Sequence, residues 1–172
     1  MKLRTIAVGL LLMLVCASGA AAQTKKKAPP AKAAAESTYD FNALMQKIFE
    51  AWSSTDPSAV AQYYAQEPKR AFYDITPLKY NDWQEYAAGY KKLMADYASA
   101  KFTLHSDARA HQRGNIAWAN GTWRGDLVKK DGTKETLNGR WTAILEKRGD
   151  NWIIVHDHFS VPLAPPPAPA KQ

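Results

Sequence analysis

Hydrophobic residues recur at helical spacing in the first half of a domain that begins near Tyr39. Between about Asp40 and Ser54 the apolar positions form one broad stripe, which predicts an amphipathic helix: Phe41, Leu44, Met45, Ile48, Phe49 and Trp52. Asp56 followed by Pro57 predicts a second, short helix, because aspartate caps helices and proline fits their first turn. A third helix is expected after Asn81, where Gln84 completes a capping-box pattern ahead of another apolar stripe.

After Ala100 the period of the apolar positions changes from helical to two, which is typical of strands. The alternation predicts one strand over 102–111, and turn residues then separate three more strands at 116–128, 135–147 and 152–161. A brief strand is expected at 71–75, between the second and third helices. These elements predict an α+β domain with three N-terminal helices packed on one face of a curved antiparallel sheet.

The first 22 residues match a secretory signal peptide. Lys2 and Arg4 precede an apolar run that ends at Cys16 and is too short for a bilayer core of about 30 Å. Small residues then allow cleavage before Gln23. We therefore expect a periplasmic or secreted mature chain with no transmembrane segment. Cys16 is the only cysteine, so this mature chain has no disulfide, thiol nucleophile or cysteine-bound metal.

The basic charge of the chain is concentrated outside the predicted domain. The full sequence has 23 basic and 16 acidic residues, but residues 39–161 contain 16 and 15 of them. This balance argues against a nucleic-acid-binding face. Residues 23–38, rich in lysine, alanine and proline, predict a flexible linker, and residues 163–172 a proline-rich disordered tail. The domain itself is expected at 39–162.

Two segments near the end of the domain carry a family resemblance. They are Gly139-Arg140-Trp141-Thr142 and Trp152-Ile-Ile-Val-His156-Asp-His158-Phe-Ser160. With the order of elements over 39–161, they resemble the SnoaL-like group of the nuclear transport factor 2-like superfamily. That superfamily includes ketosteroid isomerase-like proteins and, more distantly, the association domain of calcium/calmodulin-dependent kinase II. The resemblance implies a cone-shaped, cystatin-like fold, but this cone hosts both enzymes and non-catalytic assembly domains.

Charged and polar groups among these tryptophans indicate a pocket wall. Counting by two from Trp152 places His156 and His158 on one face of the last strand and Asp157 on the other. A bulged turn at 148–150 would put Arg140 opposite His158, whereas a turn one residue longer would put Trp141 there. An Arg140 inside the cone needs a carboxylate partner, from a ligand or from the protein; the alternative is an Arg140 on the outer face.

The leading hypothesis is a domain that binds a small, partly apolar, acidic ligand in its cone. Arg140 and His158 would anchor this ligand, and the remaining candidate ligand-binding residues are Tyr73, Tyr90, His156 and Trp123. The second hypothesis is an isomerase, dehydratase or hydrolase with His158 as acid or base and Arg140 stabilising an oxyanion. The third is a non-catalytic dimerisation module, and we expect a homodimer under all three.

Other chemistry is weakly supported by the residue pattern. His156 and His158 have the spacing of metal ligands, but no third ligand is evident, so we expect neither a metal nor another cofactor. Asp74 is the only acid on an early strand in an apolar setting, and Tyr73 beside it faces the opposite way. The base and the oxyanion donor of a ketosteroid isomerase-type reaction are therefore not both found. Nucleophile-elbow, phosphate-loop and dinucleotide motifs do not occur in the sequence.

Overall fold

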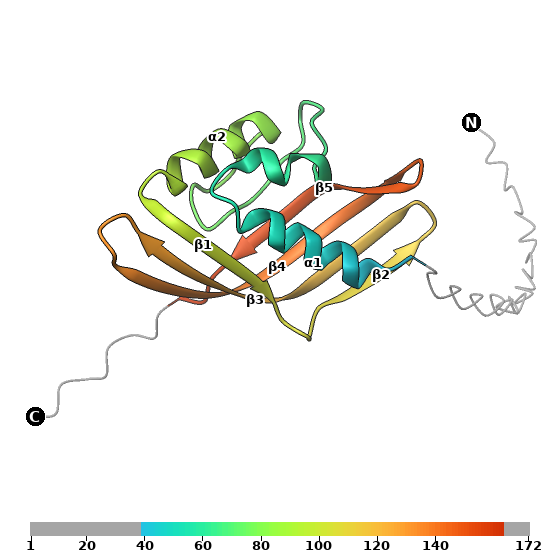
Figure 1. Ribbon diagram of the computed structural model, residues 1–172. Helices are drawn as coiled ribbons and strands as arrows, with labels where there is room; N and C mark the ends of the chain where they lie inside the picture. The colour runs from blue at the N-terminus through green and yellow to red at the C-terminus, as the bar shows by residue number, and fades with distance from the viewer. Residues whose placement is uncertain (1–38, 164–172) are drawn as a thin grey trace, which may run out of the picture. The chain divides into compact units, whose positions relative to one another are not determined.

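Helices cover one face of a curved antiparallel sheet in a computed structural model of the chain, which describes residues 39–163 (Figure 1). The elements are α1 (Phe41–Trp52), η1 (Pro57–Ala59), η2 (Ala61–Tyr63), α2 (Trp83–Met94), β1 (Tyr97–Leu104), β2 (Arg109–Arg113), β3 (Ile116–Lys129), β4 (Lys134–Arg148) and β5 (Asn151–Ser160). The predicted α+β class is confirmed. The predicted signal peptide, linker and proline-rich tail lie outside the described residues, apart from Leu163 of the tail.

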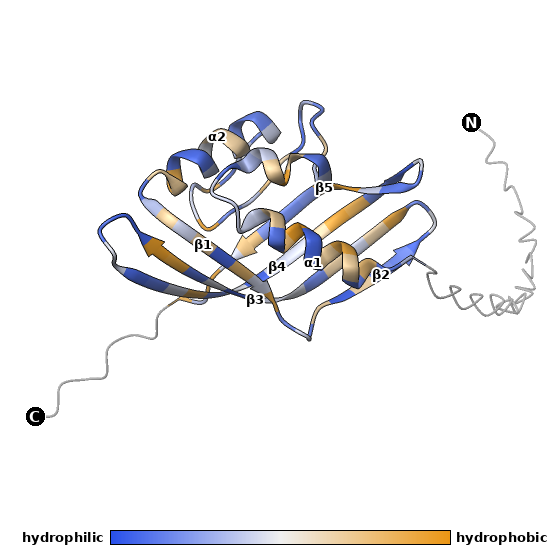
Figure 2. Ribbon diagram, in the orientation of Figure 1, coloured by the Kyte–Doolittle hydropathy of each residue, from blue (hydrophilic) through white to orange (hydrophobic). Residues whose placement is uncertain are grey.

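The sheet has the strand order β1-β3-β4-β5, and β2 pairs with β3 beyond the end of β1. The predicted strand at 102–111 is therefore two strands, because a turn in which Ala108 N donates to His105 O separates them. β1 also begins earlier than predicted, at Tyr97, which pairs with Lys129 of β3. Hydrophobic and hydrophilic residues alternate along the strands (Figure 2), so one face of the sheet is apolar and meets the helices.

The helices form where the apolar stripes predict them, with local differences at their ends. All six residues of the predicted first stripe are buried in α1. Asp56 caps the next segment by accepting from Ser58 N at 3.0 Å, as predicted, but that segment contains only the two 3-10 turns η1 and η2. α2 is capped by Asp82 rather than Asn81: the Asp82 carboxylate accepts from Glu85 N at 2.9 Å.

The segment predicted as a short strand at 71–75 makes isolated bridges instead. Phe72 pairs with Tyr80, and Tyr73 pairs with His158 of β5. The bridge between Phe72 and Tyr80 closes a loop over residues 73–79. Tyr80 packs on Gly89 of α2, where an added Cβ would lie 2.2 Å from the Tyr80 hydroxyl oxygen. This contact fixes the loop beside α2.

The core between the helices and the sheet is rich in aromatic side chains. Trp123 of β3 and Trp141 of β4 are the largest of its fully buried side chains. The Trp123 ring lies directly over Gly139 of β4, where an added Cβ would be 2.4 Å from Cε2 of the ring. A glycine at this position therefore allows an indole to lie flat against the sheet.

Candidate functional site

A cavity of ≈ 140 Å³ lies between the helices and the apolar face of the sheet. Its walls come from both helices, from the loop at 73–79 and from all the strands except β2. The lining residues are Phe49, Trp52, Asp74, Ile75, Thr76, Tyr86, Tyr90, Leu93, Met94, Tyr97, Phe102, Trp123, Leu127, Leu137 and Phe159. Nearly all of these side chains are aromatic or aliphatic, and Asp74 is the only acidic or basic residue among them.

Asp74 lies at the edge of the cavity, in the loop that follows Tyr73. Its carboxylate accepts a hydrogen bond from Ile75 N at 2.7 Å. The side chain keeps partial exposure to solvent, yet the protein around it removes enough water to raise the pKa of Asp74 to about 6. A carboxyl group with this pKa exchanges protons close to neutral pH, which suits general acid or base chemistry.

A second carboxyl group, that of Asp157 on β5, is fully buried behind the cavity wall. The Tyr64 hydroxyl donates to Asp157 Oδ2 at 2.5 Å, and Trp52 Nε1 donates to the Tyr64 oxygen at 3.0 Å. Trp141 Nε1 lies 3.5 Å from the same carboxyl oxygen, whereas Asp157 Oδ1 has no hydrogen-bond partner among the described residues. Because Trp52 and Trp141 pack on the core, this chain of hydrogen bonds ties α1 to β4 and β5.

The pKa of Asp157 is raised to about 8, mainly by burial and also by the nearby Asp74 charge, against the opposing effect of the Tyr64 hydrogen bond. Burial, followed by the nearby Asp157 carboxyl, also raises the pKa of Tyr64. Asp157 is therefore mostly protonated at neutral pH. A protonated carboxyl is a hydrogen-bond donor as well as an acceptor, and it avoids the cost of an unpaired buried charge.

The two histidines predicted to face the cone lie on the opposite side of the sheet. In the pairing of β4 with β5, Leu145 is opposite Ile154 and Ile144 is opposite His156, so Val155 is an extra, unpaired residue. This β-bulge shifts the alternation by one position. Trp152 and Ile154 point inward before the bulge, and Asp157 and Phe159 point inward after it. Counting by two from Trp152 was therefore wrong beyond Ile154.

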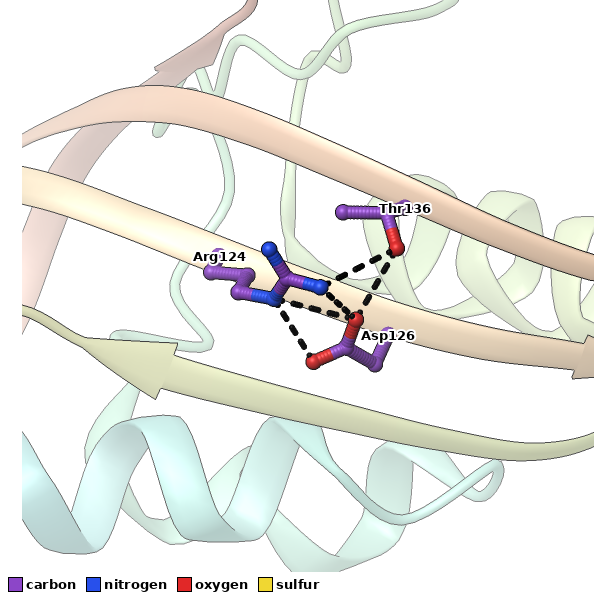
Figure 3. Close-up of polar contacts among 3 residues, drawn as sticks. All are labelled: Arg124, Asp126 and Thr136. Carbon is purple, nitrogen blue, oxygen red and sulfur yellow. Dashed lines mark hydrogen bonds and ion pairs between the residues drawn. The ribbon is translucent and has the colours of Figure 1, made fainter.

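The predicted pairing of Arg140 with His158 was also wrong. Thr142 lies opposite His158, and Arg140 lies opposite Ser160. The Arg140 side chain is exposed on the outer face of the sheet, which is the alternative that the sequence left open. Arg124 lies on the same face of β3, where its guanidinium holds the Asp126 carboxylate through Nε and Nη2, and Thr136 Oγ1 also donates to that carboxylate (Figure 3). Basic side chains of the central strands thus stay in solvent.

The other predicted site residues divide between the two faces. Tyr90 and Trp123 line the cavity. The Tyr90 hydroxyl, however, donates to the main-chain oxygens of Trp52 at 2.6 Å and Ser54 at 2.9 Å, so it fastens α2 to the end of α1. Tyr73 lies outside the cavity, with its ring 5.3 Å from that of His156 and 5.7 Å from that of His158.

His156 has a structural role in this arrangement. His156 Nδ1 bonds to the main-chain oxygen of Ala71 at 2.7 Å, which holds the segment before Tyr73 against β5. Among residues 39–163, no cluster of three histidine, cysteine or acidic side chains is placed to hold a metal ion.

Sequence reasoning missed Asp157 as an interior group, although it assigned Asp157 correctly to the face opposite the histidines. The signal was present in the composition of the strand: Phe159, two residues further on, is the kind of residue expected inside. Asp74 was noticed for its apolar surroundings and does lie at the cavity.

The comparisons with known proteins agree with this architecture. The model of the SnoaL-like domain family matches residues 41–164. A search of curated proteins gives no match. A nuclear transport factor 2-like protein of Shewanella oneidensis MR-1 is similar at 31% identity and a TM-score of 0.54, over 70% of this chain and 96% of that one.

Two further solved structures share the fold at lower identity. A putative calcium/calmodulin-dependent protein kinase II association domain of Xanthomonas campestris has 20% identity and a TM-score of 0.62, over 76% of this chain and 91% of that one. A putative dehydratase of Streptomyces avermitilis, from the same superfamily, has 16% identity and a TM-score of 0.60, over 72% and 95%. The predicted nuclear transport factor 2-like fold is confirmed.

Proposed function

The chain belongs to the SnoaL-like domain family, and from this premise we propose that it binds a small, largely apolar molecule in the cavity beside Asp74. The observation that carries this proposal is the composition of the walls, which are apolar except at Asp74 and a few hydroxyl groups. Sites for small molecules are typically concave and apolar, with few polar groups that fix the orientation of the ligand.

The class of ligand differs from the acidic one that the sequence suggested. Arg140 and His158 are exposed on the other face of the sheet, and no basic side chain of the described residues lines the cavity. A carboxylate ligand would face Asp74 without a compensating cation, which costs free energy. A neutral ligand that offers a hydrogen bond to Asp74, or a cationic one, fits better.

Trp123 lines the cavity but offers no accessible polar atom to a ligand. Its Nε1 atom is buried and has no hydrogen-bond partner among the described residues. Because this nitrogen is shielded from the cavity, recognition of a polar ligand group depends on Asp74. The favoured ligand therefore has an apolar body and one hydrogen-bond donor or cationic group.

Thermal unfolding of the chain from Gln23 onward tests this proposal against a panel of neutral aromatic compounds, sterols, amines and carboxylates. A ligand at a hundred times its dissociation constant adds about 2.7 kcal/mol to stability. We expect neutral or amine compounds to raise the unfolding temperature, the shift to shrink in Asp74→Asn, and Arg140→Ala to behave as the parent. A shift with carboxylates that disappears in Arg140→Ala would overturn the assignment.

A second candidate function is acid–base catalysis by Asp74 in the same cavity, in place of the role first given to His158. It is favoured by a carboxyl group with a pKa of about 6 against an apolar wall, and a structurally similar protein is described as a putative dehydratase. Any ligand found above is then incubated in D₂O, and exchange of its carbon-bound protons is followed by NMR. Exchange that is absent in Asp74→Asn supports catalysis; no exchange in the parent leaves a binding protein.

We also propose a homodimer formed through the outer face of the sheet. This face exposes three large apolar side chains on neighbouring strands, Ile116, Trp118 and Ile144, and one similar structure is described as a putative association domain. Sedimentation equilibrium of the parent and of Trp118→Asp tests this: the parent is expected at twice the chain mass and the variant at the chain mass. A monomeric parent at all concentrations refutes the dimer.

Export rests on residues 1–22, which lie outside the described part of the chain. We propose cleavage before Gln23 and release to the periplasm or beyond. Mass spectrometry of the protein recovered from its producing cell tests this, because the proposal requires an N-terminus at Gln23 and an intact Met1 would contradict it.

A further inference from the structure

The mouth of the cavity is bordered by aliphatic side chains that point into solvent. Ile75 and Leu93 line the cavity and are 41% and 40% exposed. Leu78, three residues after Ile75 in the same loop, is 92% exposed. Single exposed apolar residues are common on protein surfaces, but a group around the opening of an apolar cavity marks an interaction surface.

Three segments form this rim: the loop at 74–79, the end of α2 and the turn between β3 and β4. Tyr80 joins the first two, because it packs on Gly89 of α2 while its hydroxyl donates to Thr76 O at 3.3 Å. A hydrogen bond from Lys130 N to Asp96 O joins the second and third. Figure 1 shows the start of β1 and the β3–β4 turn at the same end of the sheet.

Lysines surround the exposed aliphatic residues. Lys79 follows Leu78 in the loop, and Lys91 and Lys92 precede Leu93 in the last turn of α2; all three are exposed. Over 74–79, 91–96 and 129–135 the rim contains six lysines and four acidic residues, whereas the rest of 39–161 has ten basic and eleven acidic residues. The excess positive charge of the domain is therefore at the mouth.

The acidic residues of the rim are mostly engaged. Glu135 pairs with Lys129 and accepts from the Tyr97 hydroxyl at 2.7 Å, and the Asp131 carboxylate accepts from Thr133 N at 2.8 Å within the turn. Asp74 faces the cavity. Lys79, Lys91 and Lys92, by contrast, form no ion pair with the described residues that would hold them away from solvent.

We propose that this rim docks on the surface of an anionic lipid bilayer, with Leu78, Ile75 and Leu93 entering the headgroup region. Aliphatic side chains ringed by lysines are the composition of peripheral membrane-binding surfaces, because apolar burial and attraction to anionic headgroups act together. The cavity then opens toward the bilayer, from which an apolar ligand enters without crossing water. The docking goes beyond the proposed ligand binding and does not require it.

A bilayer accounts for these features better than a protein partner does. The aliphatic side chains come from a loop and from the end of a helix, and lysines adjoin Leu78 and Leu93 in the sequence. Protein interfaces are depleted in lysine, whereas six of the rim residues are lysines.

Co-sedimentation of the mature chain with lipid vesicles tests this proposal. One set of vesicles is phosphatidylcholine alone, and the other contains about 30% phosphatidylglycerol, an anionic lipid that attracts basic surfaces. We expect binding only to the anionic vesicles, and about tenfold weaker partition for Leu78→Ser. Tyr39→Ser changes an exposed apolar residue that lies before α1, outside both the rim and the proposed dimer face; this control should bind as the parent. Equal binding of the parent and Leu78→Ser overturns the proposal.

The lysines of residues 25–32 also carry positive charge. All the variants that test the effect of charge therefore keep these lysines. Lys91→Gln/Lys92→Gln is compared with Lys101→Gln/Lys147→Gln, which changes two exposed lysines outside the three rim segments. Weaker binding of the first pair alone supports the rim, and equal weakening of both pairs assigns the attraction to overall charge and refutes it. Because these assays contain no added ligand, their failure leaves the thermal-shift result for the cavity unaffected.

Discussion

The two faces of the central strands differ in chemistry although they share the same backbone. The inner face of β3, β4 and β5 presents tryptophans, a phenylalanine and one buried carboxyl group, that of Asp157. The outer face presents Arg124, Arg140 and His158 in solvent. The sequence predicted basic side chains inside the cone, whereas the structure places them on the outer face. The difference teaches that in this domain the interior avoids fixed positive charge and accepts only a carboxyl group that can be neutralised by a proton.

The largest difference in unfolding free energy between the two faces is expected when two tryptophans of β3 are replaced. Trp123 faces inward and is 1% exposed, whereas Trp118 faces outward and is 42% exposed. Trp123→Ala should cost about 3–5 kcal/mol of unfolding free energy because it leaves a large cavity. Trp118→Ala should cost less than about 1 kcal/mol in urea unfolding at low protein concentration. Similar losses in the two variants would mean that the faces are wrongly assigned.

Asp157→Asn tests the buried carboxyl group of the inner face through the pH dependence of the unfolding free energy. The free carboxyl group of the unfolded chain loses its proton near pH 3.9, whereas the pKa of Asp157 in the folded protein is about 8. Between these values the folded state binds more protons, so stability conferred by this group is full at low pH and is lost as pH rises, by up to about 1.4 kcal/mol per unit.

The asparagine variant lacks this titration but keeps an oxygen that accepts from Tyr64. Its unfolding free energy relative to the parent should therefore rise steadily from pH 5 to pH 8 and level off above that. Urea unfolding at one-unit intervals measures the difference. A difference that stays constant over this range would show that Asp157 does not carry its proton into the folded state.

Gly139→Ala tests the close contact on the inner face. The added Cβ would lie 2.4 Å from the Trp123 ring and 2.6 Å from Ser160 O, so the indole must shift, at a cost of about 1–3 kcal/mol. Asn138→Ala, one residue earlier on the exposed face, should change stability by less than about 0.5 kcal/mol. Thermal unfolding of the pair measures both, and an equal effect would contradict the packing.

The smallest effect is expected from Arg140→Ala on the outer face. Because the side chain is exposed and lies away from the cavity, the unfolding free energy should change by no more than about 0.5 kcal/mol. The dissociation constant of any cavity ligand, measured by calorimetry, should be unchanged. A large loss of affinity would restore the original assignment of Arg140 as an anchor.

The elements were predictable because the apolar stripes are long and regular. The six residues of the first stripe are all buried in α1, and the strands from 116 onward have nearly the predicted bounds. The assignment of faces on β5 was not predictable by counting, because a bulge adds one residue without any local sequence signal as strong as a glycine or proline. The correct pairing depends on the partner strand, which sequence periodicity does not reveal.

The cavity itself could be anticipated only in part. Tyr90 and Trp123 were expected at it and are there, and Asp74 attracted notice for its apolar surroundings. Its connection to Asp157 runs through Tyr64 and Trp52, which come together only when α1, the segment after η2 and β5 pack in three dimensions. Residues that far apart in the chain leave no spacing pattern for a sequence reader to recognise.

The unpaired Val155 has a practical consequence for anyone who aligns this chain with its relatives. A relative without the bulge has one residue fewer between the positions of Ile154 and His156, so the correct alignment places a one-residue gap at Val155. An ungapped alignment would match the interior carboxyl group of Asp157 with an outward-facing position. The position of Asp157 would then look variable among relatives even where they keep an interior carboxyl group.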